Sequence, residues 1–214
     1  MTSEELIKEG RALERPCAFL RPHGTGPVAA IWHERDDEEI ESTGFHCWLT
    51  VDARQIPGLP ERIPGYVSVL TDEERCQGGR VEIVESWPGR PGTELFARSE
   101  SVLPPIDAVF AHGSEAVQQW LASNNWPRNE RYNNNFSDKA VVAPYERVWF
   151  REYPLYREDE IYAVLGGWHW PGPDDDWHEL VDDQLMVLTV RDSEPWVEAW
   201  HTRKGQFKVI QRIT

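Results

Sequence analysis

Short runs of β-branched and aromatic residues, bounded by glycine, proline and acidic turns, recur along most of this chain of 214 residues. Such runs are typical of β-strands, because these side chains suit a pleated, half-buried surface. The connections between the last three runs are only a few residues long, which favours antiparallel neighbours and predicts a β-meander over residues 184–213. The runs are VAAIWHE (28–34), FHCWLTVDA (45–53), YVSVL (66–70), RVEIVES (80–86), ERVWFREY (146–153), EIYAVLGGWHW (160–170), QLMVLTVRD (184–192), PWVEAWHT (195–202) and QFKVIQRI (206–213).

Two segments carry helical signals. Thr2 and Glu5 form a capping-box pattern before residues 3–14, where apolar residues recur at helical spacing. Ser114 is a good N-cap for a second helix over residues 114–123. We therefore predict an α+β fold with a mostly antiparallel sheet, two short helices and a C-terminal β-meander.

The connections are assigned as loops. The segment NWPRNERYNNNFSD (125–138) is polar and has no period, and HERDDEEIE (33–41) is interpreted as a solvated hairpin loop whose charges discourage edge pairing. Charge is balanced between the two halves of the chain, and no stretch resembles a linker. A single domain over residues 1–214 is the simplest prediction.

Composition narrows the function classes. The net charge of −15 argues against nucleic-acid binding, which needs a clustered basic surface. No apolar stretch approaches the roughly 18 residues of a membrane span, and the N-terminus lacks a signal-peptide pattern. Cys17, Cys47 and Cys76 form no CxxC pair, so we interpret them as buried thiols. We expect a cytoplasmic protein without a cofactor.

The most unusual segment is GGWHWPGPDDDWHELVDD (166–183), which combines three of the 11 tryptophans with a run of carboxylates. Flat indoles beside carboxylates suit cations and the lysine or arginine side chains of a protein partner. We expect Trp168 to be buried and Trp170 to be partly exposed near the rim of the sheet. The candidate binding residues are Trp168, Trp170, Asp174, Asp175, Asp176 and Trp177.

A catalytic interpretation of the same segment stays open. His169 and His178, with Asp174 or Asp176, offer imidazole and carboxylate groups that could serve a metal-assisted hydrolase. Their spacing matches neither HExxH nor an EF-hand loop, so no metal site is predicted. The chain also lacks GxSxG and a phosphate-binding glycine loop. Whether it is an enzyme stays undecided on these grounds.

The stretch GGWHWPGPDDDWHELVDDQLMVLTVRDSEPWVEAWHTRKGQFKVIQRIT resembles the tryptophan-rich C-terminal region of uncharacterised bacterial proteins. The resemblance covers about the last quarter of the chain. It implies a bacterial, cytoplasmic source and transfers no catalytic residue.

Together these features favour a non-catalytic, acidic binding protein that recognises a basic protein partner, of the toxin-neutralising kind or similar. The charge of −15 would speed the encounter with such a partner and make binding sensitive to salt. The alternative is the hydrolase, possibly metal-assisted, that uses the segment 168–178.

Overall fold

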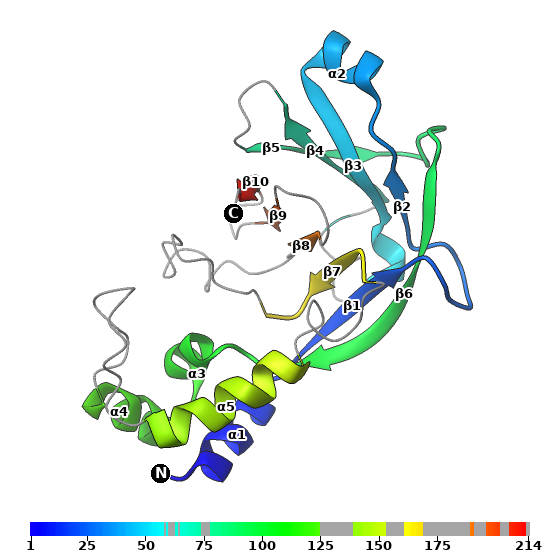
Figure 1. Cartoon of the computed structure of the whole chain (residues 1–214). Helices are drawn as coiled ribbons and strands as arrows, with labels where there is room; N and C mark the ends of the chain where they lie inside the picture. The colour runs from blue at the N-terminus through cyan, green and yellow to red at the C-terminus, as the bar shows by residue number, and fades with distance from the viewer. Residues whose placement is uncertain are drawn as a thin grey trace.

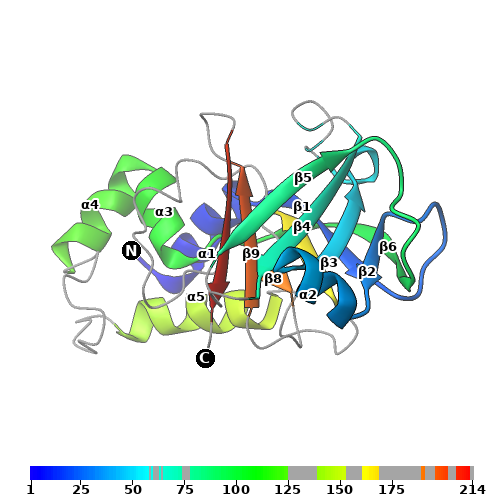
Figure 2. The same cartoon turned by 90° about the horizontal axis from the view of Figure 1, so that it is seen from above.

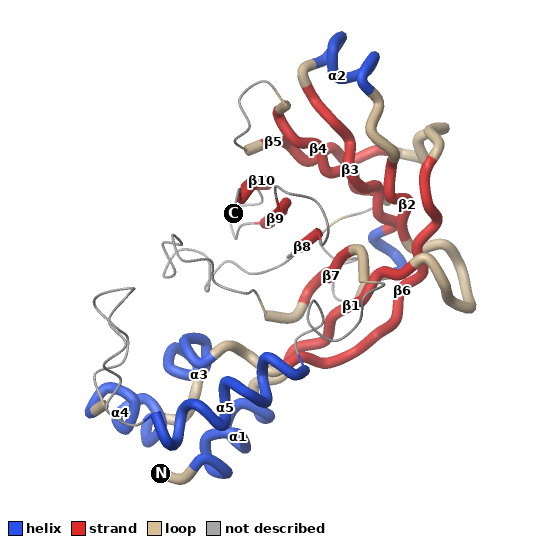
Figure 3. The backbone as a smooth tube through the Cα atoms, in the orientation of Figure 1, coloured by secondary structure: helices blue, strands red, loops and turns tan. Residues whose placement is uncertain are grey.

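A curved antiparallel sheet forms the body of the protein, with most of its helices at one end, one short helix at the other, and a β-hairpin inside its curve (Figures 1 and 3). The computed structural model describes residues 1–57, 59, 63, 65–73, 78–124, 139–152, 161–168, 189–190, 196–201 and 206–212. The fold class is α+β with a mostly antiparallel sheet, as the sequence predicts.

Eight described strands follow one another across the sheet in the order β5-β4-β3-β2-β6-β1-β7-β8, and every neighbouring pair is antiparallel. The two inner strands β1 and β6 pair along their whole shared length but are not among the runs that the sequence singles out. The eight strands are β1 (Arg15–Arg21), β2 (Ala30–His33), β3 (Phe45–Asp52), β4 (Tyr66–Asp72), β5 (Gly79–Val84), β6 (Gly92–Val102), β7 (Ala163–Gly166) and β8 (Thr189–Val190).

Strand β1 supplies side chains to two separate hydrophobic cores. Ala18 and Leu20 belong to the core inside the curve of the sheet, whereas Cys17 and Phe19 belong to the core shared with the helices. Successive side chains of a strand point to opposite faces, so one strand can serve both cores. Burial on both faces makes β1 a central strand of the fold.

A β-hairpin of β9 (Trp196–His201) and β10 (Phe207–Arg212) forms a separate two-stranded sheet. Val197, Ala199 and Val209 complete the inner core. Gln211 Nε2 donates to the backbone oxygens of Asp72 and Gly78, at 3.1 and 2.7 Å, which ties β10 to the end of β4 and the start of β5. Figure 2 shows the hairpin beside β5 when the molecule is seen from above.

The C-terminal meander is therefore only partly right. Three strands do lie within residues 184–213, and β9 and β10 pair as predicted. In the described strands, however, β8 pairs with β7 at the edge of the large sheet and not with β9. The connecting turns lie outside the described residues.

Five α-helices are described instead of the two predicted. The two predicted helices are confirmed: the Thr2–Glu5 capping box begins α1, and Ser114 accepts a hydrogen bond from Val117 N at the start of α4. A short 3-10 turn, η1 (Ala53–Gln55), follows β3. The helices are α1 (Ser3–Ala12), α2 (Asp37–Thr43), α3 (Ile106–His112), α4 (Glu115–Ser123) and α5 (Lys139–Glu152). No described helix is long and apolar enough to cross a membrane.

The strand predicted over residues 146–153 is wrong, because residues up to Glu152 belong to α5. Val142, Tyr145 and Trp149 are buried, and this spacing of three and four residues marks one helix face. The aromatic and β-branched content suggested a strand, and Pro144 inside the helix weakened the helical pattern. Packing against α1 and α3 decides the conformation.

The hairpin loop predicted over residues 33–41 is also wrong in part, because α2 occupies residues 37–43. Asp36 accepts a hydrogen bond from Glu39 N and caps the helix, and the acidic first turn suits the helix dipole. Gly44 ends the helix with a φ of 75°, a conformation that glycine adopts at little cost. The run of acids is thus a helix start and not an open loop.

Substituting alanine for Gly10 should destabilise the protein, although alanine normally strengthens a helix by about 1 kcal/mol. A Cβ at this position would lie 2.5 Å from Tyr145 Oη and 2.9 Å from Leu103 Cδ2. Tyr145 is held in place by its hydrogen bond to Pro104 O. We expect overpacking to exceed the helical gain, for a net loss of about 1 kcal/mol in urea unfolding.

The matched control is Gly89→Ala, because a Cβ there meets nothing within 4 Å. Its free energy of unfolding should change by less than about 0.5 kcal/mol. A Gly10→Ala protein as stable as the wild type would contradict the close approach of α1 and α5.

Candidate functional site

The structure describes one of the six predicted binding residues. Trp168 is 2% exposed, so its predicted burial is confirmed. Its Nε1 donates to Leu13 O at 2.7 Å, the Arg15 guanidinium lies 3.5 Å above its ring, and the His112 ring is 5.6 Å away. These contacts fix the indole between the start of β1 and the helices. Its role in binding stays a prediction.

The other five residues, Trp170, Asp174, Asp175, Asp176 and Trp177, lie outside the described residues, as do His169 and His178 of the hydrolase alternative. Among the residues that the structure does describe, no group of three or more histidine, cysteine or acidic side chains could hold a metal ion. Binding by the acidic segment and metal-assisted hydrolysis both stay untested predictions.

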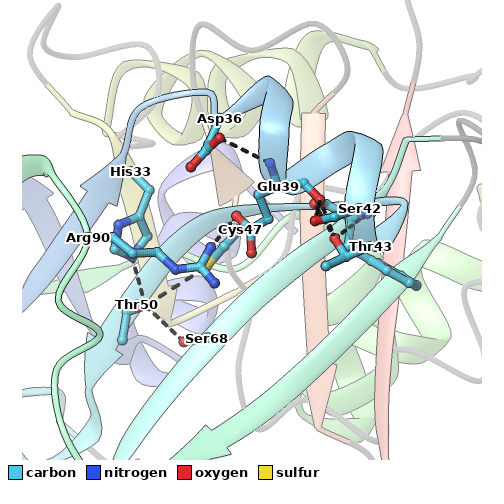
Figure 4. A network of polar contacts seen from close by, with 10 residues as sticks. His33, Asp36, Glu39, Ser42, Thr43, Cys47, Thr50, Ser68 and Arg90 are labelled. Atoms are coloured by element: carbon cyan, nitrogen blue, oxygen red, sulfur yellow. Dashed lines mark hydrogen bonds and ion pairs between the residues drawn. The ribbon is translucent and has the colours of Figure 1, made fainter.

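A cluster of polar side chains stands out on the outer face of strands β2, β3 and β4 (Figure 4). Thr50 lies at its centre: His33 Nε2 is 2.9 Å and Ser68 Oγ is 2.8 Å from Thr50 Oγ1, while Cys47 Sγ lies 4.0 Å away. All four side chains are at most 4% exposed. We call His33, Cys47, Thr50 and Ser68 the outer-face cluster.

Strand alternation puts this cluster on the outer face. Leu49 and Val51, the neighbours of Thr50, point into the inner core, as do Val67 and Val69 on either side of Ser68. The residue between two inward side chains must point outward. The polar positions therefore meet on three adjacent strands because their registers align, with Thr50 paired to Ser68.

Helix α2 and Arg90 lie over this cluster. Arg90 forms an ion pair with Glu39 of α2, and it extends from the connection between β5 and β6 (Figure 4). A second cation, Arg35, joins Asp37 of α2 to Glu73, with both N–O distances at 3.0 Å. The Glu73 backbone N–H also donates to Gly44 O at 3.0 Å. Ion pairs and one backbone bond thus connect the helix to the sheet.

Burial sets the protonation states in the cluster. It lowers the pKa of His33, and the nearby Arg90 charge acts in the same direction, while the Pro91 backbone and Glu39 raise it by less. Burial raises the pKa of the Cys47 thiol, against smaller effects of Thr50 and Arg90. The cluster therefore holds a neutral imidazole and a protonated thiol at neutral pH.

This arrangement does not suit nucleophilic catalysis. A reactive cysteine needs a lowered pKa and access to solvent, and Cys47 has neither. Cys17 is likewise buried, with its pKa raised to about 12 mainly by burial. The interpretation of these two thiols as buried residues is confirmed, whereas Cys76 lies outside the described residues. Thr50 instead joins the strands through hydroxyl bonds.

A second polar chain runs beside the cluster on the inner face. Trp48 Nε1 donates to Thr71 Oγ1 at 2.6 Å, and Thr71 Oγ1 donates to Glu73 Oε1 at 2.8 Å. A register shift between Cys47 and Leu49 marks a β-bulge at Trp48. Trp48 also contacts the Trp32 ring, 5.5 Å between centroids. Through Glu73, this chain connects to Arg35 and so to α2.

Sequence reasoning missed the outer-face cluster because its members are spread over residues 33–68. The sequence places His33 at the end of the strand run 28–34 and the start of the acidic loop 33–41, and it places Thr50 and Ser68 in strands. One signal was available in the sequence. Thr50 and Ser68 each stand between two apolar residues of a strand, and this alternation predicts that both hydroxyls point to the face opposite the apolar core. Which strands pair with which is not visible from one sequence.

Comparison of the chain with protein-family models, with curated proteins and with solved structures found no match. The candidate site is therefore defined by its geometry and electrostatics.

Replacing Thr50 by valine should destabilise the protein by about 2 kcal/mol, because His33 and Ser68 would lose a buried hydrogen-bond partner. The measurement is urea unfolding followed by circular dichroism. Thr50→Ser is the control: it keeps the hydroxyl and loses one buried methyl, at about 1 kcal/mol. Equal stabilities of the two variants would show that the hydroxyl contributes nothing.

Proposed function

We propose that this chain is a non-catalytic, cytoplasmic binding protein, of bacterial source, that recognises a basic protein partner through acidic surfaces. The partner surface in the described part of the chain is α2 with the residues just before it. Glu34, Glu38 and Glu41 are exposed there, and α2 contributes no buried residue to either core. The tryptophan-rich acidic segment 168–177 is a second candidate contact.

The observation that supports this proposal is the contrast between the outer-face cluster and the helix that covers it. A helix normally buries one apolar face, whereas α2 keeps an acidic surface open to solvent. The nearby groups capable of proton transfer or nucleophilic attack, His33 and Cys47, are closed off and uncharged at neutral pH. The charged surface, and not the buried cluster, is therefore available to a partner.

Electrostatics give this surface a physical role. The net charge of −15 attracts a cationic protein over a distance of about one Debye length, roughly 8 Å at physiological salt. Charges at the rim of an interface mainly raise the rate of association and fix orientation. We therefore expect binding that weakens strongly with salt.

The test is capture of partners from lysate of the source cell with the wild-type chain and with Glu34→Gln/Glu38→Gln/Glu41→Gln. These three substitutions leave the Asp36 cap and the ion pairs of Asp37 and Glu39 intact. We expect a basic protein to bind the wild type and to bind the triple variant on the order of tenfold more weakly, since each rim charge contributes about 0.5 kcal/mol.

The matched control is Glu85→Gln/Glu94→Gln/Glu115→Gln, which changes the net charge equally at three exposed positions away from α2. It should retain most of the binding. The proposal is contradicted when no basic protein is captured at low salt, or when both triple variants lose binding equally.

A further inference from the structure

Helix α2 is attached to the sheet by polar contacts and not by buried apolar side chains. The helix has seven residues and none of them is buried. Its described attachments include the Glu39–Arg90 ion pair, in which Arg90 is 41% and Glu39 is 15% exposed, and the Asp37–Arg35 pair, in which both side chains are more than half exposed. Exposed ion pairs contribute about 0–1 kcal/mol each, and elements held in this way open locally at low cost.

His33 lies beside Arg90 (Figure 4), four residues before α2 begins at Asp37. It is 3% exposed, and the Pro91 backbone lies close enough to the ring to favour its protonated form in part. The charged and titratable groups around it are Arg90 from the β5–β6 connection, Glu39 from α2, and His46 and Cys47 from β3. Thr50 and Ser68 supply neutral hydroxyls.

We propose that protonation of His33 releases α2 from the outer face of the sheet, so that the helix is held at neutral pH and freed in acid. A cationic His33 would stand beside the Arg90 guanidinium, and the repulsion between the two cations would disfavour the closed arrangement in which Arg90 pairs with Glu39. It would also place a charge in a site with no solvent access. The proposal does not depend on the proposed function.

The sign of the pH dependence follows from linkage. In the closed state, burial holds the pKa of His33 below its ordinary value, and in the released state the ring returns to water with a pKa of about 6.5. Opening therefore takes up a proton and is favoured as the pH falls below about 6.5. At about pH 5 this uptake can raise the open population up to about thirtyfold.

His46 is a second buried imidazole with a different position: burial lowers its pKa too, and the ion-pair groups Glu73, Arg35, Glu39 and Arg90 also act on it. It pairs with Thr71 and packs against Trp48, 4.6 Å between ring centroids. Thr71 follows the inward residue Val69 by two positions, so His46 points to the inner face.

The experiment is hydrogen exchange of the amides in residues 34–44, at about pH 7 and about pH 5, corrected for the intrinsic exchange rates. We expect the opening equilibrium of the wild type to rise at least about tenfold in acid. His33→Gln, which can still bond to Thr50 but cannot be protonated, should show no rise. His23→Gln removes an exposed histidine and should behave as the wild type.

A second variant keeps the test decisive if His33→Gln does not fold. Arg90→Gln removes both the partner of Glu39 and a charge that disfavours protonation of His33. It should raise exchange of α2 at neutral pH and raise the pKa of the His33 ring, followed by NMR. Arg11→Gln breaks comparable ion pairs with Glu14 and Glu152 at the helical end of the molecule and should change neither.

The proposal is overturned if the opening equilibrium of residues 34–44 does not rise in acid in the wild type. It is also overturned if the same rise is seen in His33→Gln. A His33 ring whose pKa is the same in Arg90→Gln and in the wild type overturns it as well.

Discussion

Burial of the central sheet on both faces is the constraint on which the rest of this structure depends. Strand β1 sends Ala18 and Leu20 into the inner core and Phe19 into the core beneath the helices. Each core needs a cover, because an apolar sheet face left in water would forfeit its stabilisation. The hairpin β9–β10 covers one face, and α1, α3 and α5 help to cover the other.

The same alternation explains the outer-face cluster. Away from the helices, strands β2, β3 and β4 still use their inward positions for the apolar core, so the outward positions His33, Thr50 and Ser68 meet on the opposite face. Beneath Arg90 and α2, His33 Nε2 and the hydroxyls of Thr50 and Ser68 form hydrogen bonds with one another instead of with water. The polar groups of the outer-face cluster are therefore buried, while the acidic side chains of α2 face the solvent.

The sequence patterns predicted the helix starts correctly where interactions between neighbouring residues determine them. The Thr2–Glu5 capping box and the Ser114 cap set the starts of α1 and α4, and both were visible in the sequence. Where packing decides, the sequence misled: α5 contains β-branched and aromatic residues and Pro144 but is held as a helix by its buried face. Strand β6 is largely polar and was missed, because its stability comes from pairing with β1 and β2.

The candidate site was harder to predict for the same reason. Thr50 and His33 are 17 residues apart, and only the antiparallel register of β2 and β3 brings them within a hydrogen bond. The acidic run before and within α2 was seen, but its helical form depends on the Asp36 and Gly44 caps acting together. The net negative charge follows from the composition, whereas the gathering of acidic side chains on one exposed helix depends on the fold.

Zero-length carbodiimide cross-linking in lysate of the source cell is the most direct test of the central claim, that the acidic surface around α2 meets a basic partner. The reagent couples a carboxylate to a lysine only when the two are in contact. The account predicts cross-links at Glu34, Glu38 or Glu41 that disappear at about 0.5 M salt, where the Debye length falls to roughly 4 Å. Cross-links confined to Glu85, Glu94 and Glu115, or unaffected by salt, would contradict it.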